Sequence, residues 1–495
     1  MLKKIKSFFF KNETTRQTVA KNTFWLAVSN IGGRLLRAIV IIYAARVLGA
    51  AGWGEFSYAV TLVAFLTIFI DFGINSVLVR ETAKSPSDEE RVRVLSTSFF
   101  MKSVLLSLGV LVVLFLVPHF VTLPGAKVLL PIVTLILVFD TLREFGFSLI
   151  RGLEKMEWET GIFLLTNAFI VVFGLLFLHY RPTVKSFTWG YVAGTLIGAS
   201  AMFYTLRDYF KNLITNFTRK LIKPILKSAW PFAIAGALGM LLTNTDILII
   251  GWLRTAEDVG YYSAALRIIQ FLYLLPVILQ VSTLPLFSRL AQENEGHKFR
   301  TVLERTISLI FLVSIPLALG GFILGNQIMS LIFGPQYLPG ALSFKILMIT
   351  MIIDFPATVL SAAIFAYNRQ KSLIVTSALG GGFNILLDLI LIPRFGITGS
   401  AFATLFAQFI SNYYLWHVMN KINHFEVARY LKRVMASAFI MSGLSVIILS
   451  LGMNVIINVA VCMTLYFLML HLMKEPLIDE MKLILRARTA EQETA

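Results

Sequence analysis

Long apolar segments separated by short polar ones make up most of this chain. Fourteen such segments can be counted, each of about 20 residues or more, the length that an α-helix needs to cross the hydrocarbon core of a bilayer. They cover residues 22–48, 53–79, 95–117, 127–150, 159–179, 188–206, 229–252, 260–287, 305–333, 341–367, 372–392, 399–420, 434–452 and 455–473. The pattern predicts an all-α polytopic membrane protein with about fourteen transmembrane helices.

Two of the apolar segments are preceded by a similar turn. Residues 47–59 (VLGAAGWGEFSYA) and 253–265 (LRTAEDVGYYSAA) both contain a glycine, then aromatic residues, then serine and a helix start rich in small residues. Internal repeats of this kind are typical of secondary transporters. We therefore expect two pseudo-symmetric six-helix lobes followed by a C-terminal helix pair. The predicted parts are an N-terminal tail (1–21), an N-lobe (22–206), a basic linker (207–228), a C-lobe (229–420), the helix pair (434–473) and a C-terminal tail (474–495).

The charges of the chain support a membrane location and set its orientation. Only 14% of the residues are charged, whereas a soluble protein has about 25%. The net charge of +17 would suggest nucleic acid as a partner of a soluble protein. Here, however, 32 of the 44 Lys and Arg residues fall in the tails and in alternate loops, and only 5 in the other loops. The positive-inside rule then places both termini in the cytoplasm, and no nucleic-acid partner is expected.

Two arginines lie near the middle of the first apolar segment. A cation at the centre of a bilayer costs about 2.5–3.5 kcal/mol on insertion scales, so Arg34 and Arg37 must face protein, water or an anion. Their i,i+3 spacing puts them on one helix face, which Asn30 extends by one turn.

Further cations could join this pair. Arg267 lies in the eighth segment with Gln270 on the same helix face, and Arg143 lies in the fourth. One interpretation is a water-filled cavity with a cationic wall, which would bind a pyrophosphate or an acidic sugar because the guanidinium fork suits such anions. The alternative is internal ion pairing, for example of Arg34 or Arg37 with Asp71.

Four carboxylates also lie within apolar segments, namely Asp71, Asp246, Asp354 and Asp388. Such residues are rare in membrane helices and often functional. Each is a candidate charge partner of a buried cation or a candidate site for a coupling proton or sodium ion.

Several motifs of enzymes do not occur in the sequence. There is no Gly-x4-Gly-Lys-Ser/Thr phosphate loop and no His-Glu-x-x-His motif, and the six histidines are scattered. The single cysteine, Cys462, excludes a disulfide within the chain. We therefore expect a transporter rather than an enzyme, with no cofactor and no metal centre, and with coupling to H+ or Na+ left open.

The N-terminal stretch, residues 21–84, carries a family resemblance. It contains LGAAGWGEFSYA at 48–59, DFGI at 71–74 and RE at 80–81, and further matches are YYSAALRI at 261–268, AYNRQK at 366–371 and the stretch 384–404. In these motifs the chain resembles the polysaccharide-biosynthesis exporters, the O-antigen repeat-unit flippases of the multidrug/oligosaccharidyl-lipid/polysaccharide superfamily. Arg34, Arg37 and Arg267 match the cationic cavity of that family by their positions in the segments.

The resemblance implies a function and its setting. The expected function is to move undecaprenyl-pyrophosphate-linked oligosaccharide repeat units across the bacterial cytoplasmic membrane by alternating access. The expected partners are this substrate, the membrane lipids, and a polysaccharide polymerase and chain-length regulator, with the chain itself a monomer. Two alternatives are a cation-coupled small-molecule antiporter of the same superfamily, which would favour an acidic cavity, and a membrane glycan polymerase or ligase, which would need a large outside loop.

Overall fold

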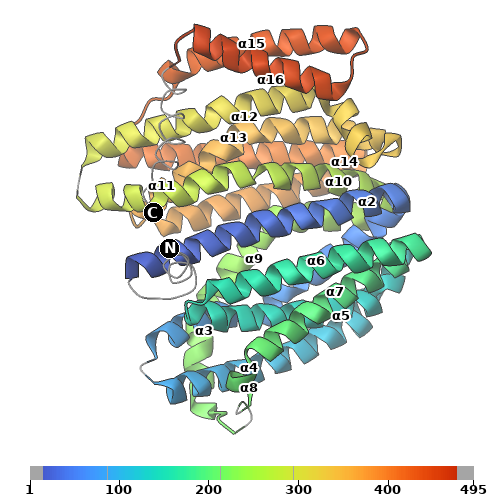
Figure 1. Cartoon of the computed structure of the whole chain (residues 1–495), viewed down its shortest axis with the longest axis vertical. Helices are drawn as coiled ribbons and strands as arrows, with labels where there is room; N and C mark the ends of the chain where they lie inside the picture. The colour runs from blue at the N-terminus through green and yellow to red at the C-terminus, as the bar shows by residue number, and fades with distance from the viewer. Residues whose placement is uncertain (1–14, 86, 212, 214, 294, 476–495) are drawn as a thin grey trace, which may run out of the picture. The chain divides into compact units, whose positions relative to one another are not determined.

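The computed structural model describes residues 15–475 except 86, 212, 214 and 294, and every regular element in this part of the chain is a helix (Figure 1). Among the described residues, 11 helices are long and apolar enough to cross a membrane. The prediction of an all-α polytopic membrane protein is therefore confirmed.

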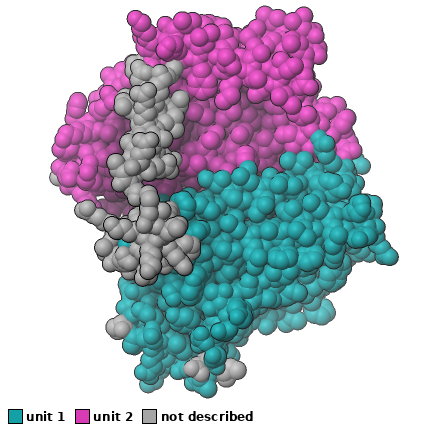
Figure 2. Space-filling model, in the orientation of Figure 1, with its two compact units in different colours: residues 1–260 teal, residues 261–495 magenta. Residues whose placement is uncertain are grey.

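The chain divides into two compact units, residues 1–260 and 261–495 (Figure 2). The α-helices of the first unit are α2 (Thr15–Asp71), α3 (Ile74–Lys84), α4 (Asp88–Leu111), α5 (Pro124–Gly152), α6 (Met156–Tyr180), α7 (Val184–Thr205), α8 (Arg207–Phe210), α9 (Ile222–Leu253) and the first residues of α10 (Ala256–Leu272). Between them lie a short π-helix, η1 (Val112–Leu116), and two short 3-10 helices, η2 (Val117–His119) and η3 (Arg219–Leu221). In this unit α6 packs on α2 and α7, and α5 packs on α2, α3 and α7.

The second unit contains the rest of α10 and the helices that follow it. These are α11 (Leu274–Gln292), α12 (Gly296–Phe333), η4 (Pro335–Gly340), α13 (Ala341–Ala366), α14 (Gln370–Ile422), α15 (Ala428–Ser450) and α16 (Val455–Leu472). Helix α13 packs against α11, α12 and α14, whereas the α15–α16 pair packs mainly against α12. The predicted lobe boundaries at 207–228 are not tested by this division and stay a prediction.

The fourteen predicted segments all fall on helices. The number of long apolar helices is smaller for two reasons. Helices α2 and α14 each contain two predicted segments, which meet at Gly49 (φ 69°) and Gly396 (φ 61°). Glycine has no Cβ and adopts a positive φ about as readily as a negative one, so the chain can turn at these positions without a loop. Helix α7, which carries the predicted segment 188–206, is not among the 11. Helix α4 begins with the Ser87 hydroxyl accepting from the backbone N–H of Glu90, which satisfies one of the unpaired groups of a helix start.

Buried contacts attach the C-terminal pair to α12. The Glu304 carboxylate accepts hydrogen bonds from Arg300, from the backbone N–H of Glu426 at 2.8 Å and from Arg429. Further along, the Tyr466 hydroxyl donates to the carbonyl oxygen of Leu312 at 2.8 Å. The charged ends and the apolar middle of the pair are thus both fixed to one helix of unit 2.

The two turns of the internal repeat meet within unit 1. When 47–59 is aligned with 253–265, Ala50 corresponds to Ala256 and Gly54 to Gly260. A Cβ atom on Gly54 would lie 1.8 Å from the carbonyl oxygen of Ala256, and one on Gly260 would lie 1.9 Å from the carbonyl oxygen of Ala50. The repeats therefore contact each other backbone to backbone, by the same pair of positions used reciprocally.

This contact predicts that Gly54→Ala and Gly260→Ala each destabilise the protein. A methyl group cannot fit against a backbone carbonyl at that distance, and overpacking of this kind costs about 1–3 kcal/mol or more. The measurement is the thermal unfolding midpoint of the purified protein in detergent. Gly161→Ala is the matched control, because a Cβ there meets nothing within 4 Å. An unchanged midpoint in both glycine variants would contradict the close contact.

Candidate functional site

The DFGI motif at 71–74 forms a break between α2 and α3. Phe72 (φ 45°) and Gly73 (φ 76°) are both left-handed, and a Cβ on Gly73 would lie 2.3 Å from the carbonyl oxygen of Ala229 on α9. After the break, an Asp71 carboxylate oxygen accepts from the backbone N–H of Asn75 at 3.4 Å. The motif therefore turns the chain beside α9 and points a carboxylate at the start of α3.

A buried lysine neutralises this carboxylate. The Lys102 ammonium lies 2.5 Å from an Asp71 oxygen and donates to the Asn75 side-chain oxygen at 3.3 Å. Lys102 comes from α4 and its side chain is 3% exposed. The sequence allowed Asp71 to pair with Arg34 or Arg37, whereas in the structure its cation is Lys102.

Helix α5 brings a second set of charges to the same region. The Arg143 guanidinium lies 2.9 Å from Asp140, one turn earlier on α5, and 5.7 Å from the centre of the Phe147 ring. Further along, Arg151 donates to both carboxylate oxygens of Glu159 on α6, at 2.9 and 2.5 Å. The Asp140–Arg143 pair is the one that i,i+3 spacing leads us to expect.

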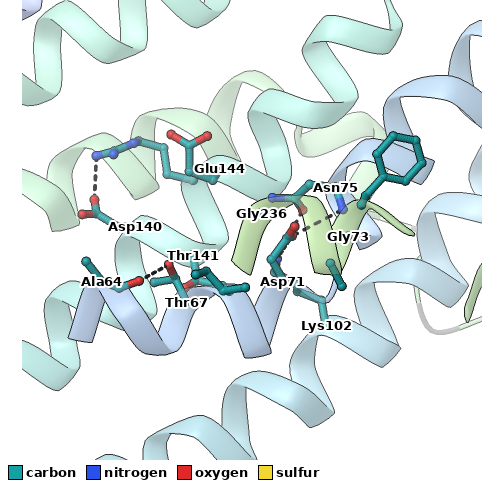
Figure 3. Close-up of a pocket in the computed structure, with 14 residues that line it drawn as sticks. Ala64, Thr67, Asp71, Gly73, Asn75, Lys102, Asp140, Thr141, Glu144 and Gly236 are labelled. Carbon is teal, nitrogen blue, oxygen red and sulfur yellow. Dashed lines mark hydrogen bonds and ion pairs between the residues drawn. The ribbon is translucent and has the colours of Figure 1, made fainter. Parts of the chain in front are cut away.

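These side chains line a cavity of about 430 Å³ within unit 1 (Figure 3). Its wall comprises Ala64, Thr67, Ile68, Asp71, Gly73, Asn75, Lys102, Asp140, Thr141, Arg143, Glu144, Phe232, Ala233 and Gly236. The wall thus carries two cations and three carboxylates. Arg143, which we expected in a cationic wall, lies in a cavity that is not cationic, and Arg34, Arg37 and Arg267 do not line it.

The first-segment arginines lie elsewhere on α2. Arg34 is exposed, whereas Arg37 is partly buried and donates from Nε to the side-chain oxygen of Asn167 on α6 at 3.1 Å. Asn167 is fully buried and donates in turn to the carbonyl oxygen of Phe163 at 2.8 Å. The side chain of Asn30 lies outside the described residues. Sequence reasoning missed Asn167, although a lone amide in an apolar segment was a signal that could have singled it out.

The predicted residues of the second unit occupy separate surroundings. Arg267 donates to the Gln270 side-chain oxygen at 3.1 Å, the i,i+3 contact expected from the sequence. Asp354 is 6% exposed and accepts from the Tyr273 hydroxyl and, at 2.7 Å, from the Asn412 side chain.

Two further predicted carboxylates are buried. Asp388 on α14 is 0% exposed, and Asn384, one turn earlier, donates to the Thr404 hydroxyl at 3.4 Å. Asp246 on α9, in unit 1, is 6% exposed. Sequence reasoning found these carboxylates and Asp354, but it missed the neutral partners of Asp354, Tyr273 and Asn412, because they come from distant parts of the chain.

The family model for polysaccharide biosynthesis proteins matches residues 19–291 of this chain, which is more than half of its 495 residues. The chain belongs to this family. A second model, MatE, matches residues 231–390. The resemblance in the sequence motifs is thus confirmed.

Curated relatives are distant but cover most of the chain. A probable low-salt glycan biosynthesis flippase of Haloferax volcanii is 22% identical over 78% of this chain and 80% of its own length. A putative O-antigen transporter of Shigella flexneri is 20% identical over 78% of this chain and 93% of its own.

Solved structures share the fold. The lipid II flippase MurJ in an inward closed conformation aligns with a TM-score of 0.76 at 18% identity, over 91% of this chain and 99% of its own. A multidrug resistance MATE family transporter of the MOP superfamily, in an inward-facing conformation, aligns with a TM-score of 0.60 at 13% identity, over 81% of this chain and 94% of its own. At these identities the likeness establishes the fold.

The buried ion pair leads to a stability prediction. Asp71→Asn removes the carboxylate bonded to the buried Lys102 ammonium and should destabilise the protein by about 3 kcal/mol, the lower end of the range for a buried pair because Asp71 is partly exposed. The double variant Asp71→Asn/Lys102→Met should recover most of this loss. Thermal unfolding in detergent measures both. Strictly additive effects of the two substitutions would contradict the pairing.

The control for this experiment is a surface pair. Arg80 and Glu81 lie 2.7 Å apart with side chains 40% and 34% exposed. Glu81→Gln should change stability by less than about 1 kcal/mol, as exposed pairs do.

Proposed function

We propose that this protein is a flippase for lipid-linked oligosaccharides and that its substrate is an undecaprenyl-pyrophosphate-linked repeat unit, moved across the cytoplasmic membrane by alternating access. The observation that carries this proposal is the setting of Arg37. Its hydrogen bond is to the neutral Asn167, and no carboxylate of the described residues lies within 4.0 Å of its guanidinium.

An arginine of this kind suits the recognition of an anion. Placing a guanidinium in an apolar segment costs free energy. An amide partner orients the guanidinium without neutralising it, so its positive charge can still attract an anionic ligand. Asn167 occupies Nε, so the two terminal nitrogens are left to bind two oxygens of a pyrophosphate at once. Arg34, one turn earlier on α2, shares the helix face and would add a second guanidinium to the same headgroup.

The rest of the substrate follows from the membrane. The polyprenyl tail would remain in the hydrocarbon, where it costs nothing, while the pyrophosphate and the glycan travel through a polar path. The relatives named as flippases and O-antigen transporters support this assignment. The expected setting is the bacterial cytoplasmic membrane with both termini in the cytoplasm, a monomeric chain, and a polysaccharide polymerase and chain-length regulator as partners.

The energy source proposed for transport is a monovalent cation, either H+ or Na+. The sequence lacks a phosphate loop for ATP, and intramembrane carboxylates are the usual carriers of coupling ions. Among the four predicted candidates, Asp71 already has Lys102 as a cation. Asp354, Asp246 and Asp388 are buried, and these three remain the candidates.

The decisive variants are Arg37→Ala and Arg34→Ala. Loss of a charge-assisted hydrogen bond costs about 1.5–3 kcal/mol, so each should slow transport about tenfold or more. The measurement is the rate at which a fluorescent oligosaccharide on a polyprenyl pyrophosphate crosses the membrane of proteoliposomes that contain the purified protein.

Two further variants make this experiment specific. Arg37→Lys keeps the charge but loses the fork, and it should fall between wild type and Arg37→Ala. The control variant Arg181→Ala removes a cation from a predicted outside loop, and the transport rate should stay equal to that of wild type. Full transport by the double variant Arg34→Ala/Arg37→Ala would overturn the proposal, and transport of a small organic cation instead of the glycolipid would favour the antiporter alternative.

A further inference from the structure

The start of α9 and the short helix η3 before it carry four exposed cations. These are Arg219, Lys220, Lys223 and Lys227, which we call the α9 basic face. None of the four makes a hydrogen bond or an ion pair with another residue of the part of the chain that the structure describes. No Asp or Glu occurs between residues 209 and 245, so the sequence around them supplies no compensating charge.

The cations lie on the side of α9 that faces away from the core of unit 1. Lys220, Lys223 and Lys227 follow one another at i, i+3 and i+7, the repeat of a single helix face. The opposite face is buried, because Ile225 and Ala229 belong to an apolar cluster formed with residues of α3 and α4. The start of α9 is therefore amphipathic, with an apolar side on the protein and a basic side turned outward.

The local structure does not favour cations at these positions. Lys223 and Lys227 are like charges at i and i+4, which repel each other on a helix. Both also lie in the first turns of α9, where the helix dipole favours anions. An anionic surface beside the α9 basic face would remove both unfavourable effects.

The positive-inside rule alone does not explain this arrangement. That rule requires only an excess of Lys and Arg in a loop, at any position and with acidic residues allowed. Two other loops predicted to lie inside are mixed: residues 80–93 contain four cations and four carboxylates, and residues 288–305 contain four and three. Residues 209–228 contain five cations and no carboxylate. The alignment of these cations on one outward face is thus a feature beyond topology.

Apolar side chains continue the same face toward the membrane. Leu226 and Trp230, one turn after Lys223 and Lys227 respectively, are 38% and 52% exposed. They belong to the candidate membrane span Arg219–Leu241, in which 11% of the most apolar window is buried, the lowest share among the 11 candidate spans of the described residues. Tryptophan is enriched where membrane helices pass from the headgroup layer into hydrocarbon. The α9 basic face therefore lies at the level of the lipid headgroups.

We propose that the α9 basic face is a docking surface for anionic phospholipids, such as phosphatidylglycerol, in the leaflet where α9 enters the membrane. The charges are complementary, since phosphodiester oxygens accept hydrogen bonds from ammonium and guanidinium groups. The exposed Leu226 and Trp230 pack against the acyl chains of the same lipids, a contact that a nucleic acid or an acidic protein does not offer. The contact is reversible, and no covalent bond changes.

The bound lipids would hold a helix start that contacts the DFGI motif. The carbonyl oxygen of Ala229, two residues after Lys227, lies close to Gly73 at the break between α2 and α3. Lipids on the outward side of α9 therefore support the packing on its inner side. This binding does not require flippase activity, so the two can be tested separately.

The test measures which lipids bind to the purified full chain. The protein is kept in a neutral detergent and titrated with phosphatidylglycerol, or with phosphatidylcholine that has the same acyl chains, and native mass spectrometry counts the lipids bound per chain. The test variant replaces all four cations of the α9 basic face and is Arg219→Gln/Lys220→Gln/Lys223→Gln/Lys227→Gln.

A matched control removes the same number of charges elsewhere. It also replaces one arginine and three lysines, all of them exposed and in other segments predicted to lie inside. The control variant is Lys298→Gln/Arg369→Gln/Lys371→Gln/Lys432→Gln. Its net charge equals that of the test variant, so any difference between the two reflects the position of the cations.

Wild type and the control should bind phosphatidylglycerol about fivefold or more tightly than phosphatidylcholine, whereas the test variant should bind the two lipids equally. Lys220→Arg/Lys223→Arg/Lys227→Arg should keep the preference, because it retains the charges. In wild type the preference should shrink as salt is raised, since salt screens exposed charges. This last measurement needs no variant, so it tests the proposal even if the fourfold substitution impairs folding.

Three results would overturn the proposal. The first is a preference of the test variant equal to that of wild type, and the second is an equal loss in the control. The third is tight binding of a polyprenyl phosphate without any preference for phosphatidylglycerol, because the surface would then belong to the path of the transported lipid.

Discussion

The cost of charge in an apolar environment is the constraint on which the packing of unit 1 depends. Lys102 is almost completely buried, and it can be so only because Asp71 and Asn75 meet its ammonium. Asp71 ends α2 and Asn75 lies in the first turn of α3, so the contact spans the break at Phe72 and Gly73. The backbone of α9 lies close to Gly73 at this break. One ion pair therefore relates the positions of α2, α3, α4 and α9 to one another.

The same constraint distinguishes the cations of this chain by their partners. Lys102 and Arg143 are both matched by carboxylates; the Lys102–Asp71 pair joins α4 to α2, and the Arg143–Asp140 pair lies within α5. Arg37 is matched by an amide, which orients it without cancelling its charge. The nature of the partner, rather than the depth of the residue, separates a structural cation from one that suits an anionic ligand.

Sequence reasoning succeeded where the governing physics is local. Hydropathy located the membrane helices, and i,i+3 spacing anticipated the contacts of Arg143 with Asp140 and of Arg267 with Gln270. It failed where the partner is remote in the chain. Asn167 is 130 residues from Arg37, and periodicity says nothing about which faces of two distant helices meet. The predicted cationic wall counted arginines, but the amide partner of Arg37 could be assigned only once α2 and α6 were packed.

The reciprocal contact of Gly54 with Ala256 and of Gly260 with Ala50 has a consequence for how this protein can change over time. Two copies of an ancestral segment normally diverge independently once they have been joined in one chain. Here each copy presents its carbonyl to the other's glycine, so a bulkier residue in one copy is opposed by the unchanged backbone of its twin. No side-chain substitution in the partner can make room, because the obstacle is main chain. As long as this contact is kept, a change at either glycine is therefore opposed by main chain, which a compensating side-chain change cannot remove.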